Sequence, residues 1–352
     1  MTSDNINFDK TSGEWLSGEG PESDIVISSR IRLARNINIF PFMARMDVKQ
    51  RSELEEFVRS RIMNLTFPSK LTYYSLDNAT EMDLEYLVER HLISRDLAQV
   101  EGAKAVAIGE HEITSIMINE EDHLRIQTLL SGFQLDRLWK LSDQVDDILD
   151  SVLPYSFHPQ FGYLTACPTN VGTGMRVSVM LHLPGLAITN QIEKVFYAVS
   201  KISLAVRGLY GEGSNASSDF YQISNQITLG KTEEQLLDNL KSVIPQIIRY
   251  EREARQKLFH DDRNNLEDKI FRAWGIMKNA RVLSLEECLE HMSTLRLGVN
   301  LDILKDIPLA SLNELFILSL PAHLQKKSHL TLNDLQKNKV RADHVREIFS
   351  KL

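Results

Sequence analysis

One segment of this chain, Arg176 to Leu183, alternates between apolar and other side chains. Successive side chains of an extended chain point to opposite faces, so the alternation predicts a β-strand with one face against a core. The second face is then available to present polar groups to a ligand. The predicted core face carries Val177, Val179, Leu181 and Leu183, and the opposite face carries Arg176, Ser178, Met180 and His182.

Four other short segments have a similar β-like character, and amphipathic stretches alternate with them between about residues 24 and 250. Closely spaced strands of this kind predict an antiparallel sheet flanked by helices, which is an α+β fold. The four segments are Ser115 to Ile118, Leu124 to Leu130, Leu204 to Leu209 and Tyr221 to Leu229.

A helical pattern begins after Gly230. Thr232 and Gln235 have the spacing of a capping box, and apolar residues then recur at helical intervals. We expect Pro245 to kink this helix, because a proline inside a helix removes a backbone donor and clashes with the preceding turn. From about residue 255 the sequence is mostly helical.

These patterns divide the chain into three expected parts. Residues 1–23 form an irregular N-terminal arm, residues 24–254 an α+β domain, and residues 255–352 an all-helical C-terminal domain. A chain of 352 residues is long enough for two such domains.

Composition excludes several classes of protein. The 48 Asp and Glu outnumber the 40 Lys and Arg, and a net charge of −8 argues against a nucleic-acid-binding surface. Cys167 and Cys288 are far apart, which excludes a disulfide framework or a thiolate metal site, and a small buried thiol is the expected fate of Cys167. No stretch has the about 20 apolar residues of a membrane span, and the first residues lack a secretion signal. We expect a cytoplasmic protein.

An acidic cluster, NEEDH at residues 119–123, directly follows an apolar β-like segment. Three adjacent carboxylates repel one another unless a metal ion or a guanidinium group lies among them. The alternative is a solvated acidic turn, since charge runs are usually surface features.

Arginines recur beside several of the polar motifs. In SSRIR, Arg30 and Arg32 would share one face of a strand, where both guanidinium groups could bind polyphosphate oxygens. The alternative is the charged face of a surface strand. Further arginines follow NEEDH and CPTNVGTG and precede GEGS, namely Arg125, Arg176 and Arg207.

Two glycine-containing segments could lie close to a ligand. CPTNVGTG, residues 167–174, permits a close backbone approach but matches neither the Walker A pattern nor the Rossmann fingerprint. In GEGS, Gly211 and Gly213 flank Glu212, which suits a loop that carries a carboxylate into a site, although a plain surface turn has the same composition.

Five motifs in one order, SSRIR, NEEDHLR, CPTNVGTGMR, VRGLYGEGS and YQISNQITLG, resemble the catalytic domain of the phosphagen (guanidino) kinases. The resemblance covers about residues 24 to 254, and with the helical C-terminal region it extends to the bacterial protein-arginine kinases of that family. It implies a glutamine-synthetase-like catalytic core that binds ATP and Mg²⁺. The implied ATP-binding residues are Ser28, Ser29, Arg30, Ile31, Arg32, His91, Arg125, Arg176, Val177, Ser178, Val179, Met180, Arg207, Gly208, Leu209, Tyr210 and Gly211.

The resemblance also implies roles for the carboxylates. Glu121 would be the base that orients and deprotonates the guanidinium, and Glu212 would hold that group from the loop. A protonated arginine has a pKa above 12 and no available lone pair, so attack on phosphorus requires a carboxylate that removes a proton. Glu120 and Asp122 would lie near magnesium, through water.

The target arginine is expected to belong to another protein. Small-substrate phosphagen kinases have a helical N-terminal domain of roughly a hundred residues, whereas about 25 residues precede SSRIR here. The alternatives are a small-molecule arginine kinase and a non-catalytic phosphoarginine-binding adaptor, and the adaptor would have lost catalytic residues that this chain retains.

The C-terminal motif departs from the bacterial family. The family's RDxxRA motif forms an allosteric phosphoarginine pocket, whereas this chain has Lys337 and Asn338 before Arg341 and Ala342. A lysine can bind the phosphate of phosphoarginine only as a point charge, without the two-pronged contact of an arginine. An asparagine has no carboxylate with which to bind the guanidinium. A basic helix face is the alternative interpretation.

The resemblance implies partners that composition and spacing do not reveal. They are a zinc-finger activator protein, the ClpC–ClpP protease that recognises phosphoarginine as a degradation mark, and heat-shock repressor substrates, which would place the chain in a stress response. The resemblance also allows a homodimer.

Overall fold

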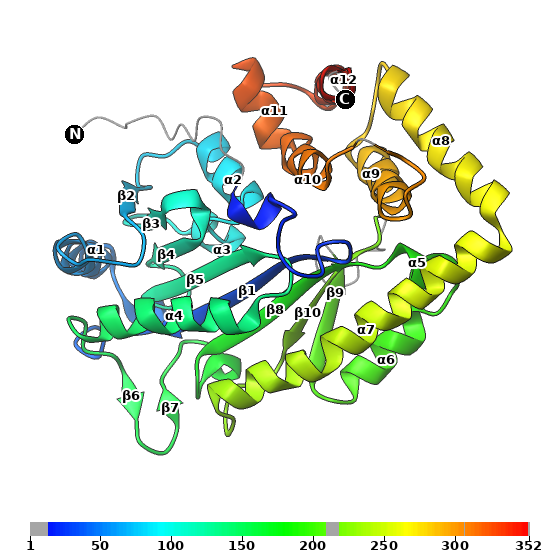
Figure 1. Ribbon diagram of the computed structural model, residues 1–352. Coiled ribbons are helices and arrows are strands. Elements are labelled where there is room, and N and C mark those ends of the chain that lie inside the picture. The colour runs from blue at the N-terminus through cyan, green and yellow to red at the C-terminus, as the bar shows by residue number, and fades with distance from the viewer. Residues whose placement is uncertain (1–12, 209–217, 306, 351–352) are drawn as a thin grey trace.

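A computed structural model describes residues 13–208, 218–305 and 307–350, and its centre is an eight-stranded sheet (Figure 1). The strand order is β2-β3-β4-β5-β1-β8-β10-β9, and each neighbouring pair is antiparallel. The strands are β1 (Val26–Arg35), β2 (Leu71–Ser75), β3 (Ala105–Gly109), β4 (Thr114–Ile118), β5 (Leu124–Ser131), β8 (Met175–His182), β9 (Leu204–Gly208) and β10 (Phe220–Asn225), and a separate hairpin joins β6 (Phe157–His158) to β7 (Gly162–Tyr163).

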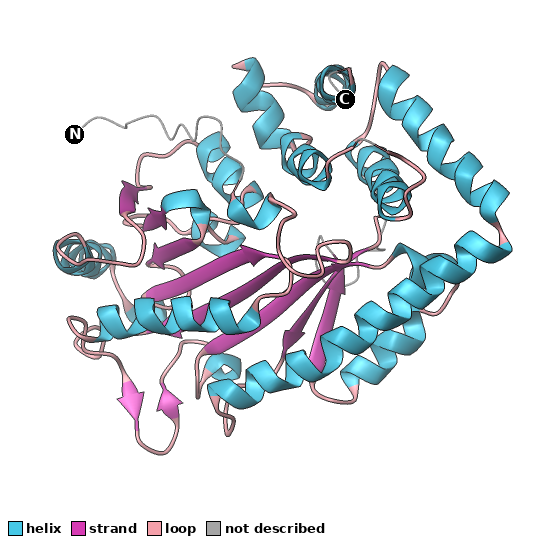
Figure 2. Ribbon diagram, viewed as in Figure 1, coloured by secondary structure: helices cyan, strands magenta, loops and turns pink. Residues whose placement is uncertain are grey.

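Helices flank this sheet and follow it in the chain, so the predicted α+β architecture is confirmed (Figure 2). Beside the sheet lie α1 (Val48–Ile62), α2 (Glu81–Glu89), α3 (Arg95–Gln99), α4 (Leu135–Asp150), α5 (Pro184–Ile188), α6 (Ile192–Ser200) and α7 (Glu233–Asp261). The C-terminal region contains α8 (Arg263–Asn279), α9 (Leu285–Asn300), α10 (Leu309–Leu318), α11 (Pro321–Ser328) and α12 (Asp334–Phe349).

The core face of the sheet follows the predicted alternation. In β1, Ile31 and Leu33 are fully buried and belong to the same apolar cluster as α4 and α7. Leu138 of α4 and Leu240 of α7 are also fully buried there. The opposite face of the sheet carries the arginines, together with apolar residues such as Leu129 and Phe220 that belong to the cluster of the C-terminal helices.

The C-terminal helices form a second apolar cluster, which includes the buried Cys288 and extends to Ile27, Leu129 and Phe220 of the sheet. Figure 1 shows them beyond the face of the sheet that α4 and α7 leave uncovered. Pro245 lies inside α7, a helix of 29 residues, and does not interrupt it, so the kink stays a prediction. Among the described helices, none is long and apolar enough to cross a membrane.

The described part of the N-terminal arm is bound between the sheet and the C-terminal helices. Trp15 lies in a 3-10 helix (Glu14–Leu16) and is 1% exposed. Asn313 Nδ2 donates to the Leu16 carbonyl at 3.0 Å, and a second C-terminal side chain, Arg296, donates to the Ser23 carbonyl. From residue 13 onward this segment is thus part of the packed structure.

The strand predicted over Tyr221 to Leu229 ends earlier, at Asn225. The Asn225 side chain accepts from Val177 N at 2.8 Å and donates to the Met175 carbonyl at 3.0 Å. These bonds hold the end of β10 to β8 through a side chain, and the chain then leaves the sheet.

Candidate active site

The register of the sheet brings the predicted arginines to one face. Arg32 of β1 lies opposite Arg176 of β8, and Arg30 lies opposite Ser178. On the other side of β1, Ala34 lies opposite Arg125 of β5. Since residues directly opposite in a ladder share a face, arginines from three strands point the same way.

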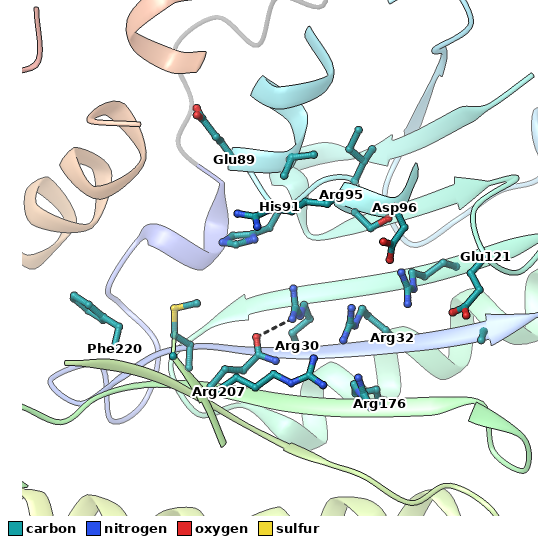
Figure 3. Close-up of a pocket in the computed structure, with 18 of the residues that line it drawn as sticks. Arg30, Arg32, Glu89, His91, Arg95, Asp96, Glu121, Arg176, Arg207 and Phe220 are labelled. Carbon is teal, nitrogen blue, oxygen red and sulfur yellow. Dashed lines mark hydrogen bonds between the residues drawn. The ribbon is translucent and has the colours of Figure 1, made fainter. Parts of the chain in front are cut away.

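A cavity of about 1020 Å³ opens over this face (Figure 3). This volume lies just above the usual range for ligand sites, about 300–1,000 Å³. In Figure 3, Phe220 lies at one end of the row of labelled side chains and Glu121 at the other, with arginines between them. The sequence-predicted residues in the lining are Arg30, Arg32, His91, Glu121, Arg125, Arg176, Met180, Arg207 and Gly208.

The clustered guanidinium groups repel one another. Burial, with Arg125 and Arg176 next in size, lowers the pKa of Arg30 to about 10. Burial and the neighbouring arginines also hold the pKa of Arg32 well below its ordinary value. The Arg32 Nε atom is buried and has no hydrogen-bond partner among the described residues. An anionic ligand with several oxygens would satisfy this donor and relieve the repulsion, so these residues fit a polyphosphate.

His91 joins the arginines from the turn after α2. It has a left-handed backbone with φ of 59°, and its carbonyl accepts from Gln127 Nε2 at 2.6 Å. The imidazole ring of His91 and the indole ring of Trp15 form a T-shaped pair, with the centroids 5.1 Å apart. Burial, reinforced by Arg30 and Arg32, lowers the pKa of His91 to about 3. The imidazole is therefore neutral at pH 7 and can offer a hydrogen bond without adding charge.

The acidic turn between β4 and β5 presents Glu121 to the cavity. Asn119 adopts φ of 63°, its N–H donates to the His123 carbonyl at 3.0 Å, and its side chain is anchored to the Ala103 carbonyl at 2.8 Å. Glu121 itself is exposed. Partial burial, followed by the charge of Asp122, raises its pKa, and a raised pKa favours proton uptake.

The two flanking carboxylates point into the protein instead. Glu120 accepts from Arg125 and Ser94 on one oxygen and from the Glu121 N–H on the other. Asp122 Oδ1 accepts from Asn36 Nδ2 and from the backbone N–H of Ala166, both at 2.6 Å. Neither arrangement suits direct magnesium ligation, and the described residues contain no group of three or more His, Cys, Asp or Glu side chains that could hold a metal ion. A water-mediated role for Glu120 and Asp122 stays a prediction.

Two family models match the chain. One is described as "ATP:guanido phosphotransferase, C-terminal catalytic domain" and covers residues 53–254. The other is described as "Protein-arginine kinase McsB C-terminal domain" and covers residues 263–352. A curated protein named protein-arginine kinase from Symbiobacterium thermophilum is 46% identical over 96% of this chain and 96% of its own length. The chain belongs to the protein-arginine kinase family.

Other relatives agree. A protein-arginine kinase from Halothermothrix orenii is 44% identical over 96% of this chain and 97% of its own length. Among solved structures, lombricine kinase has a TM-score of 0.59 and 26% identity, over 67% of this chain and 68% of that one. The duplicated taurocyamine kinase of Schistosoma mansoni, with bound transition state analog components, gives the same TM-score and identity over 70% of this chain, which spans 34% of that longer chain. The phosphagen-kinase fold predicted for this family member is confirmed.

Some residues that the family resemblance implied lie away from the main cavity. Ile31, Val177 and Val179 face the apolar core. Ser29 is buried, and its hydroxyl donates to the Gly132 carbonyl at 2.7 Å. Alternate residues of a strand point to opposite faces of the sheet, so these side chains lie on the face opposite the cavity. Ser28 and Ser178 line a small neighbouring void, and Leu209, Tyr210, Gly211 and Glu212 lie outside the described residues.

Cys167 corrects one expectation. We predicted a buried thiol, but Cys167 is partly exposed and lines the cavity, with Sγ 3.0 Å from Thr169 Oγ1. The Asp122 carboxylate holds the N–H of Ala166 and so fixes the chain just before the cysteine. The turn at Pro168 to Asn170 then directs the segment along the cavity margin.

Several lining residues of this protein-arginine kinase gave no signal in the sequence. Glu89 and Asp96 come from the segment around α2 and α3, and Gln222 accepts from Arg30 Nη2 at 2.9 Å. Leu285, Phe316, Leu320 and Pro321 come from the C-terminal helices. Only the folded chain brings them to one cavity, because they lie up to about 230 residues apart in sequence.

Two residues of the altered C-terminal motif, Arg341 and Ala342, are buried, and the other two, Lys337 and Asn338, are partly exposed. Arg341 is 2% exposed, and its guanidinium donates to the Ser319 carbonyl at 2.8 Å, the Leu283 carbonyl at 3.0 Å and Asn338 Oδ1 at 2.7 Å. Lys337 pairs with Asp334 at 3.4 Å, and Ala342 is buried. In this arrangement Asn338 serves as an acceptor within its own helix.

Proposed function

We propose that this chain transfers the γ-phosphoryl group of ATP to arginine side chains of other proteins. One observation carries the proposal: a single cavity holds the arginine cluster in its middle and the exposed Glu121 at one end. An arginine cluster fits the triphosphate, and a carboxylate fits the incoming guanidinium.

The cage arginines would position the triphosphate and oppose the charge that develops on its oxygens. Arg30, Arg32 and Arg176 lie on β1 and β8, which pair within the sheet, and this pairing would limit their reorganisation during transfer. Phosphoryl transfer depends mainly on such positioning and charge stabilisation. Magnesium, when bound with ATP, supplies further neutralisation of the phosphate oxygens. Glu120 supports this end of the site by holding the Arg125 guanidinium.

Glu121 would act on the acceptor. Its carboxylate binds the target guanidinium and takes a proton from the attacking nitrogen, while the N–P bond forms and the bond from phosphorus to the β–γ bridging oxygen breaks. ADP then leaves. The raised pKa of Glu121 brings its basicity closer to that of the developing phosphoguanidine. Glu212 stays our candidate for a second carboxylate.

A protein is the favoured acceptor because Glu121 is exposed at its end of the cavity, whereas the C-terminal helices line the other end. An open carboxylate is accessible to an arginine on a large partner. We also propose that the chain divides into residues 1–23, 24–254 and 255–352 and that it is cytoplasmic. By family resemblance, we propose a zinc-finger protein as activator and the ClpC–ClpP protease as partner. The phosphorylated arginines would then mark proteins for degradation.

The test is incubation with labelled ATP and either casein or free arginine. We expect acid-labile label on casein and little on free arginine. Glu121→Gln should abolish labelling with an unchanged fold, and Glu110→Gln, an exposed glutamate outside the cavity lining, should behave as wild type. Efficient labelling of free arginine alone would instead identify a small-molecule arginine kinase, and normal labelling by Glu121→Gln would refute the base assignment.

A further inference from the structure

The cavity has an apolar end that the phosphate cage does not use. Phe220 lies at this end in Figure 3, on the far side of Arg30 and Arg207 from Glu121. Phe220 meets Phe316 of α10 edge to face, with ring centroids 5.4 Å apart. The catalytic sheet and the C-terminal helices therefore close this end of the cavity together.

The C-terminal side of this end consists of apolar side chains. Leu285 begins α9, Phe316 lies in α10, and Leu320 and Pro321 lead into α11, and all four line the same cavity as the arginine cluster. From the sheet, Met180 completes the apolar lining. None of these side chains offers a charge or a strong hydrogen-bonding group, so the ligand part that fits here is apolar and flat or compact.

Polar contacts to α2 fix this wall in place. The Glu89 carboxylate accepts from the backbone N–H groups of Ala322 at 2.8 Å and His323 at 3.0 Å, at the start of α11. It also pairs with His323 Nδ1 at 2.7 Å. Further along α11, Lys326 pairs with Asp83 at 2.8 Å. The start of α11 is thus bound to the helix that leads directly to His91.

We propose that the C-terminal helices form the base-binding end of the nucleotide site, with Leu285, Phe316 and Leu320 packing against the adenine ring of ATP. This inference rests on the proposed function. The order of features along the cavity, apolar end, arginine cluster and Glu121, matches the order base, phosphates and acceptor in the reacting complex. An adenine ring buries apolar surface at this end while its triphosphate lies over the arginines.

The experiment compares two ligands that differ in the base. Isothermal titration calorimetry measures the Kd of ATP and of inorganic tripolyphosphate for wild type, Leu285→Ala and Phe316→Leu. Leu285 is half-buried in the first turn of α9, where alanine is well tolerated, and Phe316→Leu keeps a large apolar side chain in the core. Val282→Ala is the matched control, because Val282 is 46% exposed and does not line the cavity.

We expect Leu285→Ala to raise the Kd of ATP about tenfold, or ~1.4 kcal/mol, while tripolyphosphate binding stays within about twofold of wild type. Phe316→Leu should act in the same direction, and Val282→Ala should change neither ligand. Retained tripolyphosphate binding also shows that the variants are folded.

Equal weakening of both ligands, or unchanged ATP binding in both variants, would overturn the inference. A raised KM for casein with an unchanged Kd for ATP would also overturn it, since the wall would then contact the protein substrate. A wild-type protein that binds neither ATP nor tripolyphosphate would contradict the proposed function itself, so the two failures are distinguishable.

Discussion

The arginine cluster should lower the free energy of unfolding of the ligand-free protein, compared with a variant in which one of these charges is removed. The charged form of Arg30 is disfavoured in the folded state, where its pKa is about 10, and the ordinary value is above 12. Because neutral pH lies below both values, the folded protein bears the full cost of this charge, ~3 kcal/mol at ~1.4 kcal/mol per pKa unit. The side chain also donates to Gln222 at 2.9 Å and Ser178 at 3.4 Å, which together return ~1–2 kcal/mol.

Arg30→Met should therefore raise the free energy of unfolding of the ligand-free protein by ~1–2 kcal/mol. The same substitution removes a charge-assisted contact to phosphate worth ~1.5–3 kcal/mol, so ATP affinity should fall about tenfold to a hundredfold. The variant is thus predicted to be more stable without ATP and less stabilised by it.

Urea denaturation followed by circular dichroism, with and without a non-hydrolysable ATP analogue, measures both effects. In wild type, ligand at about a hundred times its Kd should add ~2.7 kcal/mol. Arg272→Met is the control, because Arg272 is 76% exposed on α8 and should change neither quantity. If ligand-free Arg30→Met is less stable than wild type, the buried charge of Arg30 does not destabilise the ligand-free protein, and the reasoning is wrong.

Two further predictions concern other charged groups. Burial is the main cause of the raised pKa of Glu121, and the charges of Asp122, Glu120 and Asp96 add to it. A base must be deprotonated to act, so kcat/KM should fall as pH drops through the pKa of Glu121, and Asp96→Asn should move this fall to lower pH. An unmoved pH profile would contradict the coupling. Glu251 is fully buried and accepts from two backbone N–H groups of α5 and from Arg255. Glu251→Ala should therefore lower the free energy of unfolding, measured by urea denaturation, by about 3–5 kcal/mol. A loss below ~1 kcal/mol would be inconsistent with this network.

Local patterns predicted the sheet and the phosphate end of the site. The period of two in Arg176 to Leu183 separated core from ligand face, and the same rule placed Arg30 and Arg32 together. The order of motifs indicated the family. Each motif and each alternation is a short sequence pattern, so the sequence of one chain was enough to identify them.

The apolar end of the cavity was not predictable in the same way. Phe316 and Leu285 follow ordinary helical spacing, which indicates a core position and nothing more. Their place in the cavity is set by the packing of the C-terminal helices on the catalytic sheet and on α2, which joins residues far apart in sequence. Cys167 was misassigned for a related reason: its exposure depends on the anchoring of the preceding residue by Asp122.

The central claim is that Glu121 and the arginine cluster join ATP to a protein-borne arginine. Mass spectrometry of two peptides that differ only in one Arg→Lys substitution, each incubated with the protein and ATP, tests it most directly. We predict one acid-labile phosphoryl group on the arginine peptide and none on the lysine peptide, with no product from Glu121→Gln. Phosphate on serine, threonine or lysine, or equal product from the Glu121→Gln variant, would contradict the account.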